Sequence, residues 1–215
     1  NGPLRVLLLM GKGVILSVMK YIVLILGLVF TPAPLFAERI PLANLSQYLN
    51  GIRAVQSTFT QINADGTVST GDIYLNRPGR VRFEYDDEQL LVIAGGGQLA
   101  IFDGRSNTRP EQYPLAETPL NLILARTVDL QQSGMVTRHT FDGTSTRVVA
   151  QDPDRPEIGT IELVFTDEPV ELRQWVITDE GGNETTLALG VLDADVTLRS
   201  RLFNIPFEIR DREGE

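Results

Sequence analysis

After Thr58 the apolar residues recur at every second position, in short runs separated by turn-forming residues. The alternating runs are Ile73–Leu75, Val81–Tyr85, Ile161–Phe165 and Leu187–Val191, and Leu90–Ala94 and Leu99–Phe102 are shorter runs of consecutive apolar residues. A period of two is typical of β-strands that bury one face. Asp-Gly pairs and glycine-rich stretches between the runs supply the positive φ angles of tight hairpins. The pattern therefore predicts one antiparallel sheet, strongly curved or partly closed.

Two helices are expected beside this sheet. In the first, Leu42, Leu45, Leu49 and Ile52 recur at spacings of three and four, and Tyr48 and Val55 widen the apolar stripe. The second covers 118–126, with Thr118 as its cap and Pro119 in its first turn. Leu120, Ile123 and Leu124 lie on one side of it, so it is expected to cover an apolar surface. The fold class predicted is α+β, mainly β.

The first 37 residues have the composition of a secretory signal peptide. They contain three basic residues and no acid, and an apolar run of ten residues from Tyr21 is followed by a segment that ends in the small residue Ala37, just before the polar Glu38. We expect cleavage after Ala37 and a single domain over 38–215. Residues 1–18 could be upstream read-through before Met19, and a transmembrane anchor over 4–30 is the alternative. Lys12 and Lys20 and the two prolines disfavour that anchor.

Composition excludes several function classes. The chain has no cysteine and one histidine, His139, which argues against disulfides, thiol chemistry, a lipid-modified cysteine and a multi-histidine metal site. The 28 acidic residues outnumber the 19 basic ones, which argues against nucleic acid as a partner. No catalytic constellation occurs in the sequence. We expect neither an enzyme nor a protein with a cofactor or metal.

The stretch from Val55 to Arg126 resembles the LolA family of periplasmic lipoprotein carriers. The motifs that carry the resemblance are Phe-Thr-Gln at 59–61, the block Gly71-Asp-Ile-Tyr-Leu-Asn-Arg-Pro-Gly-Arg-Val-Arg-Phe-Glu-Tyr85, and the Thr-Pro-Leu of the second helix. Leu202–Pro206 resembles the closing strand of the family. The turn at Gly95–Gly97 and the acidic tail at 208–215 depart from the family pattern.

The resemblance implies an incomplete antiparallel barrel with a helical lid over an apolar cavity. The cavity residues expected from the motif positions and the inner face of the sheet are Val81, Phe83, Tyr85, Ile161, Leu163 and Phe165. The lid and its latch are expected to include Leu120, Ile123, Leu124 and Arg77. In this interpretation Arg77 points into the mouth of the barrel and binds polar groups of the lid, whereas Arg80 and Arg82 are solvated.

The function implied is that of a periplasmic chaperone that transports outer-membrane lipoproteins. Its expected partners are acylated lipoproteins, an inner-membrane lipoprotein-releasing ABC transporter and an outer-membrane acceptor, and the carrier is expected to be a monomer. Two alternatives remain open: a periplasmic shuttle for lipids or glycolipids, and an RseB-like lipid-sensing regulator. An outer-membrane receptor of the LolB type would need a lipobox cysteine, which the sequence lacks.

Overall fold

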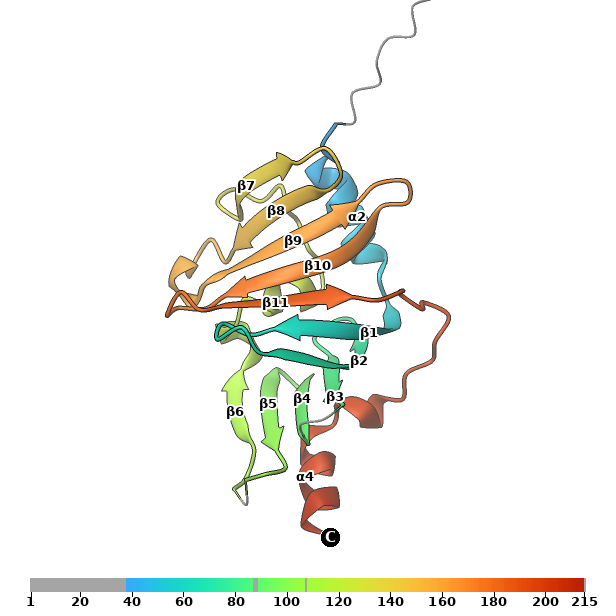
Figure 1. The fold of residues 1–215 in the computed structure, drawn as a ribbon, viewed down its shortest axis with the longest axis vertical. Helices are drawn as coiled ribbons and strands as arrows, with labels where there is room; N and C mark the ends of the chain where they lie inside the picture. The colour runs from blue at the N-terminus through green and yellow to red at the C-terminus, as the bar shows by residue number, and fades with distance from the viewer. Residues whose placement is uncertain (1–37, 87–88, 107, 215) are drawn as a thin grey trace, which may run out of the picture. The chain divides into compact units, whose positions relative to one another are not determined.

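A computed structural model describes residues 38–86, 89–106 and 108–214, so the predicted signal peptide lies outside the described residues. The described chain is mainly β, which confirms the predicted fold class (Figure 1). Its helices are α2 (Leu42–Gly51), α3 (Asn121–Leu124) and α4 (Ile205–Glu213), with short 3-10 turns η1 (Leu115–Glu117), η2 (Pro156–Ile158) and η3 (Ser200–Phe203). Its strands are β1 (Ala54–Ile62), β2 (Val68–Asn76), β3 (Val81–Tyr85), β4 (Leu90–Gly95), β5 (Gln98–Asp103), β6 (Glu111–Pro114), β7 (Val136–Phe141), β8 (Thr146–Gln151), β9 (Thr160–Thr166), β10 (Glu171–Thr178) and β11 (Glu184–Leu189).

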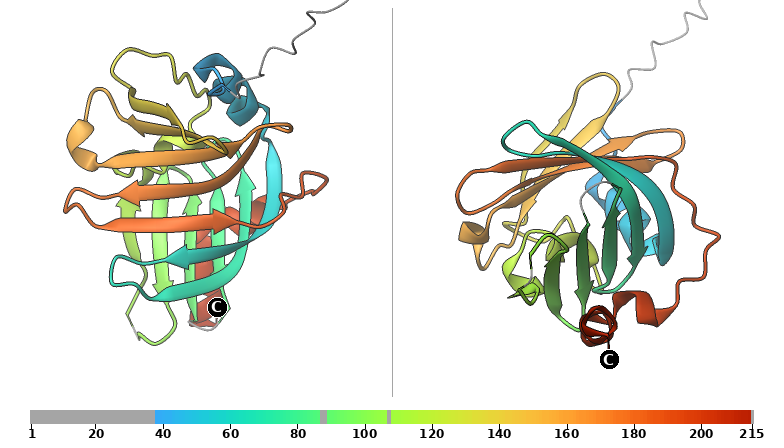
Figure 2. Two further views of the ribbon diagram at one scale, coloured as in Figure 1. Left: turned by 45° about the horizontal axis from the view of Figure 1, so that its top comes forward. Right: turned by 60° about the horizontal axis from the view of Figure 1, so that its bottom comes forward.

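The strands form one antiparallel sheet that does not close on itself. Their order is β6-β5-β4-β3-β2-β1-β11-β10-β9-β8-β7, so two meanders meet where β1 pairs with β11. Within the described residues β6 and β7 lie at opposite ends of the sheet. Figure 2 shows the sheet curving around α2. The result is an incomplete barrel, as predicted.

Gly71 permits a close approach within this curved sheet. It pairs with Phe59 on β1 and with Tyr85 on β3. A Cβ atom at this position would lie 1.9 Å from the backbone oxygen of Glu84. Any larger residue would push β2 and β3 apart, so the glycine of the motif has a backbone role.

The core lies between the concave face of the sheet and the segments that cover it. Leu45 and Leu49 of α2 pack in one hydrophobic cluster with Val81 of β3 and Phe165 of β9. Ile123 and Leu124 of α3 belong to the same cluster. The apolar stripe of the first predicted helix and the alternate residues of the strands therefore face each other, as their periodicities require.

Both predicted helices are shorter than expected. The first ends at Gly51, and Val55 belongs to β1, where it pairs with Leu75. Nine residue pairs between β1 and β2 outweigh the helical spacing at this position. The second contains only the four residues of α3, and the Thr118 hydroxyl donates to Leu115 O at 2.8 Å instead of capping a helix.

The expectation of a closing strand over 202–206 is wrong. These residues form the end of η3 and the start of α4. Asn204 Oδ1 accepts a hydrogen bond from Phe207 N at 2.8 Å, which caps α4, and Pro206 is suited to the first turn of a helix. Ile205 and Ile209 then pack on a second apolar cluster formed with Leu91, Ile93, Ala100 and Phe102 of β4 and β5.

The expectation that Arg82 is solvated is also wrong. Its side chain is only 13% exposed and pairs with Glu84 at 2.6 Å and with Glu208 of α4 at 3.0 Å. Arg80 is half-buried and donates to Asn76 O and Asn76 Oδ1 at 3.2 and 3.0 Å. Both arginines therefore stabilise local structure, and Arg82 fastens the C-terminal helix to the sheet.

Candidate functional site

Two segments cover the concave face of the sheet: α2 and the connection 115–130, which runs through η1 and α3. We call them together the lid. Leu115, Val128 and Leu130 of the connection are buried in the same cluster as Leu45 and Leu49 of α2. The lid therefore supplies one wall of the core and the sheet supplies the other.

Hydrogen bonds from α2 join the two parts of the lid. Asn50 Nδ2 donates to Val128 O at 2.8 Å, and Asn50 Oδ1 accepts from Val128 N at 2.9 Å. One turn earlier, Ser46 Oγ accepts from Leu130 N at 3.0 Å. Asn50 and Ser46 thus provide hydrogen-bond partners for backbone groups of the connection that would otherwise be buried without a partner. The two parts of the lid are thus linked into one unit.

Arg77, at the end of β2's hairpin, connects the sheet to both parts of the lid. Its guanidinium donates to Leu49 O at the end of α2 and to Asn50 Oδ1 at 3.4 Å. It also donates to Ala125 O, just after α3, at 2.6 Å. The residue type alone would suggest a solvated turn arginine, but this side chain is buried and bonded to both parts of the lid, and we call Arg77 with these bonds the latch.

The latch is not fully satisfied. Arg77 is 8% exposed, and its Nε is buried without a hydrogen-bond partner among the described residues. Burial, followed by the charge of Arg53, lowers the pKa of Arg77, although an arginine stays charged at physiological pH. A buried cation bonded to neutral oxygens carries a desolvation cost that opening to water would remove. Closure by Arg77 is therefore opposed by the burial of its own charge.

Tyr48 provides a second tie between the lid and the sheet. Its hydroxyl accepts a hydrogen bond from Leu172 N of β10 at 3.0 Å, and its ring packs edge-on against Phe165 at 6.0 Å. Burial is the largest cause that raises the pKa of Tyr48, so the hydroxyl remains protonated across the physiological range. Tyr48 and Arg77 thus hold the lid to strands on opposite halves of the sheet, β10 and the end of β2.

The side chains predicted to line a cavity are packed against one another. Val81, Ile161 and Phe165 are 0% exposed, Leu163 is 1% exposed and Phe83 is 5% exposed. The Phe83 ring makes edge-on contacts with Phe59 and Trp175, at 5.7 and 6.5 Å between centroids. With the lid in this position, these side chains are buried in one apolar core.

Tyr85 lies at the edge of this interior. It is half-buried, its ring meets Phe59 edge-on at 5.1 Å, and its hydroxyl donates to Gln61 Oε1 at 2.8 Å. The predicted lid residues Leu120, Ile123 and Leu124 are 6%, 3% and 0% exposed in the same cluster. The structure therefore brings together the residues that the sequence grouped as interior and lid.

An open groove of about 780 Å³ lies beside the lid. We call it the α2 groove. One wall is α2 with the start of β1, and the other is formed by the turn between β9 and β10 and by residues 192 and 194. Its apolar lining includes Ile52, Val55, Val170 and Leu192, and its charged residues are Arg53 and Glu171. The sequence analysis assigned no role to this surface.

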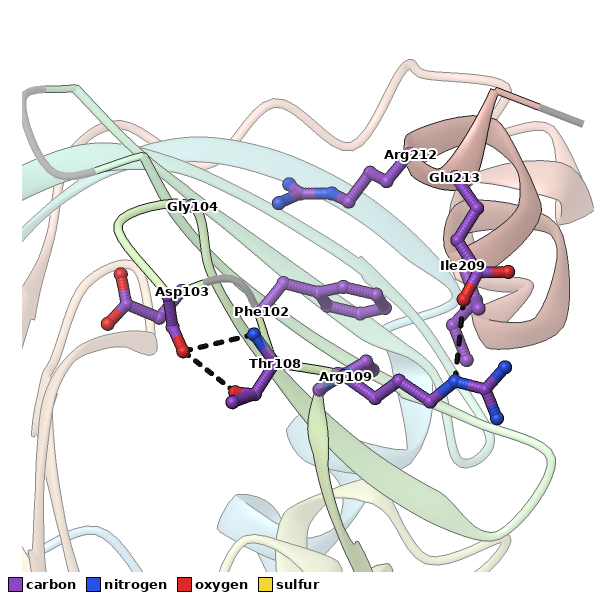
Figure 3. A pocket seen from close by; sticks show the side chains of 10 residues that line it. Phe102, Asp103, Gly104, Thr108, Arg109, Ile209, Arg212 and Glu213 are labelled. Atoms are coloured by element: carbon purple, nitrogen blue, oxygen red, sulfur yellow. Dashed lines mark hydrogen bonds and ion pairs between the residues drawn. The ribbon is translucent and has the colours of Figure 1, made fainter.

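A smaller hollow of about 370 Å³ lies on the outer face, between the end of β5 and α4 (Figure 3). Phe102 and Ile209 form its apolar floor, and Arg212 lies over the Phe102 ring at 5.0 Å. Arg109 and Glu213 pair across it at 3.4 Å. These contacts attach α4 to the sheet, and no lid residue lines the hollow.

The described part of the chain holds no group of three or more metal-ligating side chains. None of the helices found in residues 38–214 is long and apolar enough to span a membrane. His139, on β7, is half-buried, and its Nε2 lies 3.0 Å from Ile40 O. It therefore holds the start of the domain against the sheet.

The sequence matches a family model and named relatives from other organisms. The model of the family described as "Outer membrane lipoprotein carrier protein LolA" matches residues 50–206. An outer-membrane lipoprotein carrier protein of Coxiella burnetii is 26% identical over 170 residues, which are 74% of this chain and 79% of that protein. One of Methylococcus capsulatus is 32% identical over 73 residues, 31% of this chain and 35% of the relative.

Solved structures with low sequence identity were also found. A LolA superfamily protein from Nitrosomonas europaea aligns over 77% of this chain and 98% of its own, with 10% identity and a TM-score of 0.43. A putative outer-membrane lipoprotein-sorting protein domain from Vibrio parahaemolyticus aligns over 76% and 94%, with 10% identity and a TM-score of 0.46.

Proposed function

The chain belongs to the LolA family of outer-membrane lipoprotein carrier proteins, and on this basis we propose that it binds the acyl chains of lipoproteins in its interior when the lid opens. The observation that carries the proposal is the latch. Arg77 is buried beneath the lid and bonded to both of its parts, yet one of its nitrogens lacks a partner among the described residues. These bonds hold the lid closed, and the cost of burying the Arg77 charge limits the stability of the closed form, so the lid can open again.

The interior has the chemistry that an acyl chain requires. Each buried CH₂ group contributes about 0.8 kcal/mol, so a lipoprotein with several chains needs an apolar cover in water. In the closed form the lid covers the apolar face of the sheet, so the lid and the acyl chains compete for the same surface. The protein therefore has an equilibrium between a closed, empty form and an open form, and a ligand shifts it only as far as the ligand prefers the open form. The carrier must therefore have a closed state of only moderate stability.

The surrounding steps follow from the same proposal. The protein would be exported by the signal peptide over 1–37, accept lipoproteins from an inner-membrane ABC transporter, and pass them to an acceptor at the outer membrane. It would act as a monomer, because the lid must be reachable by both partners in turn. Periplasmic localisation would give it the aqueous space in which acyl chains need a carrier.

The test is delivery of cargo by an Arg77→Leu variant. Losing the latch bonds destabilises the closed, empty form and so favours the loaded form. We expect the variant to fold and to bind an acylated lipoprotein, but to transfer it to acceptor membranes about tenfold more slowly, which corresponds to about 1.4 kcal/mol. Arg77→Lys should retain part of the transfer, because it keeps the charge but not the fork of donors.

Arg199→Leu is the matched control, since Arg199 is an exposed arginine outside the lid. It should transfer cargo at the rate of the original protein. Equal transfer by the Arg77→Leu variant, the Arg199→Leu variant and the unmodified protein would contradict the proposed role of the latch.

A further inference from the structure

The α2 groove has the size and lining of a small-molecule site. Its volume of about 780 Å³ lies within the usual range for such sites, roughly 300–1,000 Å³. Ile52 and Val55 on one wall face the side that contributes Val170 and Leu192. Val55 is buried, whereas Ile52, Val170 and Leu192 are half-buried, so with the lid in this position part of each of these three side chains faces the groove.

One positive charge in the groove is not neutralised. Of the two charged residues that line the groove, Glu171 pairs with Arg173 at 3.0 Å, and the carboxylate of Asp193, next to the groove, accepts a hydrogen bond from Asp195 N at 3.0 Å and keeps its charge. In the part of the chain that the structure describes, the Arg53 side chain has neither an ion pair nor a hydrogen bond. The groove therefore carries one free cation in a chain whose net charge is −9.

Arg77 adds to the positive character behind the groove. The backbone N–H of Arg77 donates to Arg53 O at 2.9 Å, so the two residues adjoin. Burial, and after it the charge of Arg53, lowers the pKa of Arg77, as expected for two like charges on adjoining residues. An anion at Arg53 would offset that repulsion.

We propose that the α2 groove binds a long-chain fatty acid while the lid is closed, with the acyl chain along Ile52, Val55, Val170 and Leu192 and the carboxylate on Arg53. The planar guanidinium fork matches a carboxylate with two parallel hydrogen bonds, and such charge-assisted bonds are among the stronger ones. The proposal does not rest on lipoprotein transport, because none of the groove contacts requires the lid to open.

The experiment measures binding of the fluorescent fatty acid cis-parinaric acid and of its methyl ester to the full domain. We expect the protein to bind the acid at least tenfold more tightly than the ester. Arg53→Gln should weaken binding of the acid about tenfold and leave binding of the ester unchanged. Leu192→Asp, in an exposed loop, should weaken both. Arg199→Gln is the control for loss of one exposed arginine and should change neither.

Several results would overturn the proposal. Equal affinity for acid and ester, no binding of either, or an Arg53→Gln variant that binds the acid as before would each exclude Arg53 as the carboxylate site. Displacement of the probe by lysophosphatidylcholine as effectively as by a fatty acid would exclude carboxylate recognition. Unchanged binding in the Leu192→Asp variant would place the probe elsewhere. Thermal unfolding of each variant establishes that it is folded, and failure of lipoprotein transfer would leave these results unaffected.

Discussion

At the scale of single residues, the lid depends on polar side chains that bind backbone groups. Arg77 donates to Leu49 O and Ala125 O, and Tyr48 accepts from Leu172 N. Each of these bonds joins groups on different elements, so each would be lost in the proposed opening of the lid. A hydrogen bond contributes about 0.5–1.5 kcal/mol net between neutral groups and about 1.5–3 kcal/mol to a charged group, so a few of them would give the closed lid a moderate stability.

Replacing Tyr48 by Phe should isolate the contribution of one such bond. The ring contact with Phe165 is retained, while Leu172 N loses its acceptor. We expect the free energy of unfolding to fall by about 1 kcal/mol and the Leu172 amide to exchange faster with solvent. Tyr113→Phe is the control, since Tyr113 is 45% exposed, and its effect should stay within about 0.5 kcal/mol. Equal stability of both variants would show that the hydroxyl of Tyr48 does not hold the lid.

At the scale of elements, the lid consists of α2 and a connection of little regular structure. Asn50 makes two hydrogen bonds with Val128 and Ser46 makes one with Leu130. The connection has the four-residue helix α3 and little else to hold its shape. Its order therefore derives from α2, and the two parts should move together.

Asn50→Leu tests this coupling. Loss of both bonds to Val128 should lower the free energy of unfolding by about 1–3 kcal/mol and accelerate hydrogen exchange at the Val128 amide. Asn44→Leu, an exposed position on the same helix, is the matched control and should leave that amide protected. If exchange at Val128 is unchanged in the Asn50→Leu variant, then the connection holds its shape without α2.

The C-terminal helix has an attachment that depends on pH. Burial tends to raise the pKa of Glu208, but its bonds to Arg212 and Arg82 outweigh burial, and the pKa is lowered overall. A carboxylate with a lowered pKa stabilises the fold above its unfolded pKa of about 4.3, and this stabilisation is lost as the pH falls through the folded value. The difference in unfolding temperature between the original protein and Glu208→Gln should therefore be largest near neutral pH and shrink below about pH 4. A difference that stays constant with pH would contradict this role.

Alternation predicted β2, β3, β9 and β11, because side chains on a half-buried strand must alternate, and the short apolar runs predicted β4 and β5. The strands β1, β6, β8 and β10 were not predicted. Periodicity was also wrong where another interaction was stronger. Val55 continued the helical spacing of α2, but pairing with β2 places it in a strand. At the C-terminus the resemblance of Leu202–Pro206 to the family's closing strand suggested a strand, whereas Asn204 and Pro206 are a helix cap and a first-turn proline. These two residue types were the available signal for α4.

The site was predictable only in part. The grouping of interior residues followed from alternation, and the position of Arg77 followed from the family block. Asn50 and Ser46 were missed, although two polar residues four positions apart beside Leu45 and Leu49 indicate side chains turned toward a buried partner. Val128 and Leu130, their partners, have no periodic pattern that would identify them. Hydrogen bonds from side chains to a segment without regular secondary structure therefore cannot be predicted from sequence periodicity.

At the scale of the whole molecule, one core serves both stability and the proposed binding. Phe83→Ala should lower the free energy of unfolding by roughly 3–5 kcal/mol, because the ring is 5% exposed and packed against Phe59 and Trp175. An acyl ligand should then raise the unfolding temperature more in this variant than in the original protein, since it fills the space left by the ring. Trp175, the one tryptophan in the chain, reports on the interior by its fluorescence.

Phe102→Ala is the comparison, because Phe102 is buried in the second apolar cluster on the outer face. The Phe102→Ala variant should be less stable than the original protein, but an acyl ligand should raise its unfolding temperature no more than it raises that of the original protein. An equal ligand response in the two variants would show that acyl chains do not enter beside Phe83.

The two edge strands of the sheet, β6 and β7, are not paired with each other in the described structure, so strand pairing does not fix the width of the incomplete barrel. In a closed barrel every ladder hydrogen bond resists expansion, and the radius is set by the number and tilt of the strands. Among the described residues no strand pairing joins β6 to β7, so movement of one meander away from the other would disrupt core and lid contacts but none of the ten strand pairings. If the chain carries lipoproteins as proposed, such a movement would let its interior accommodate cargoes with different numbers of acyl chains.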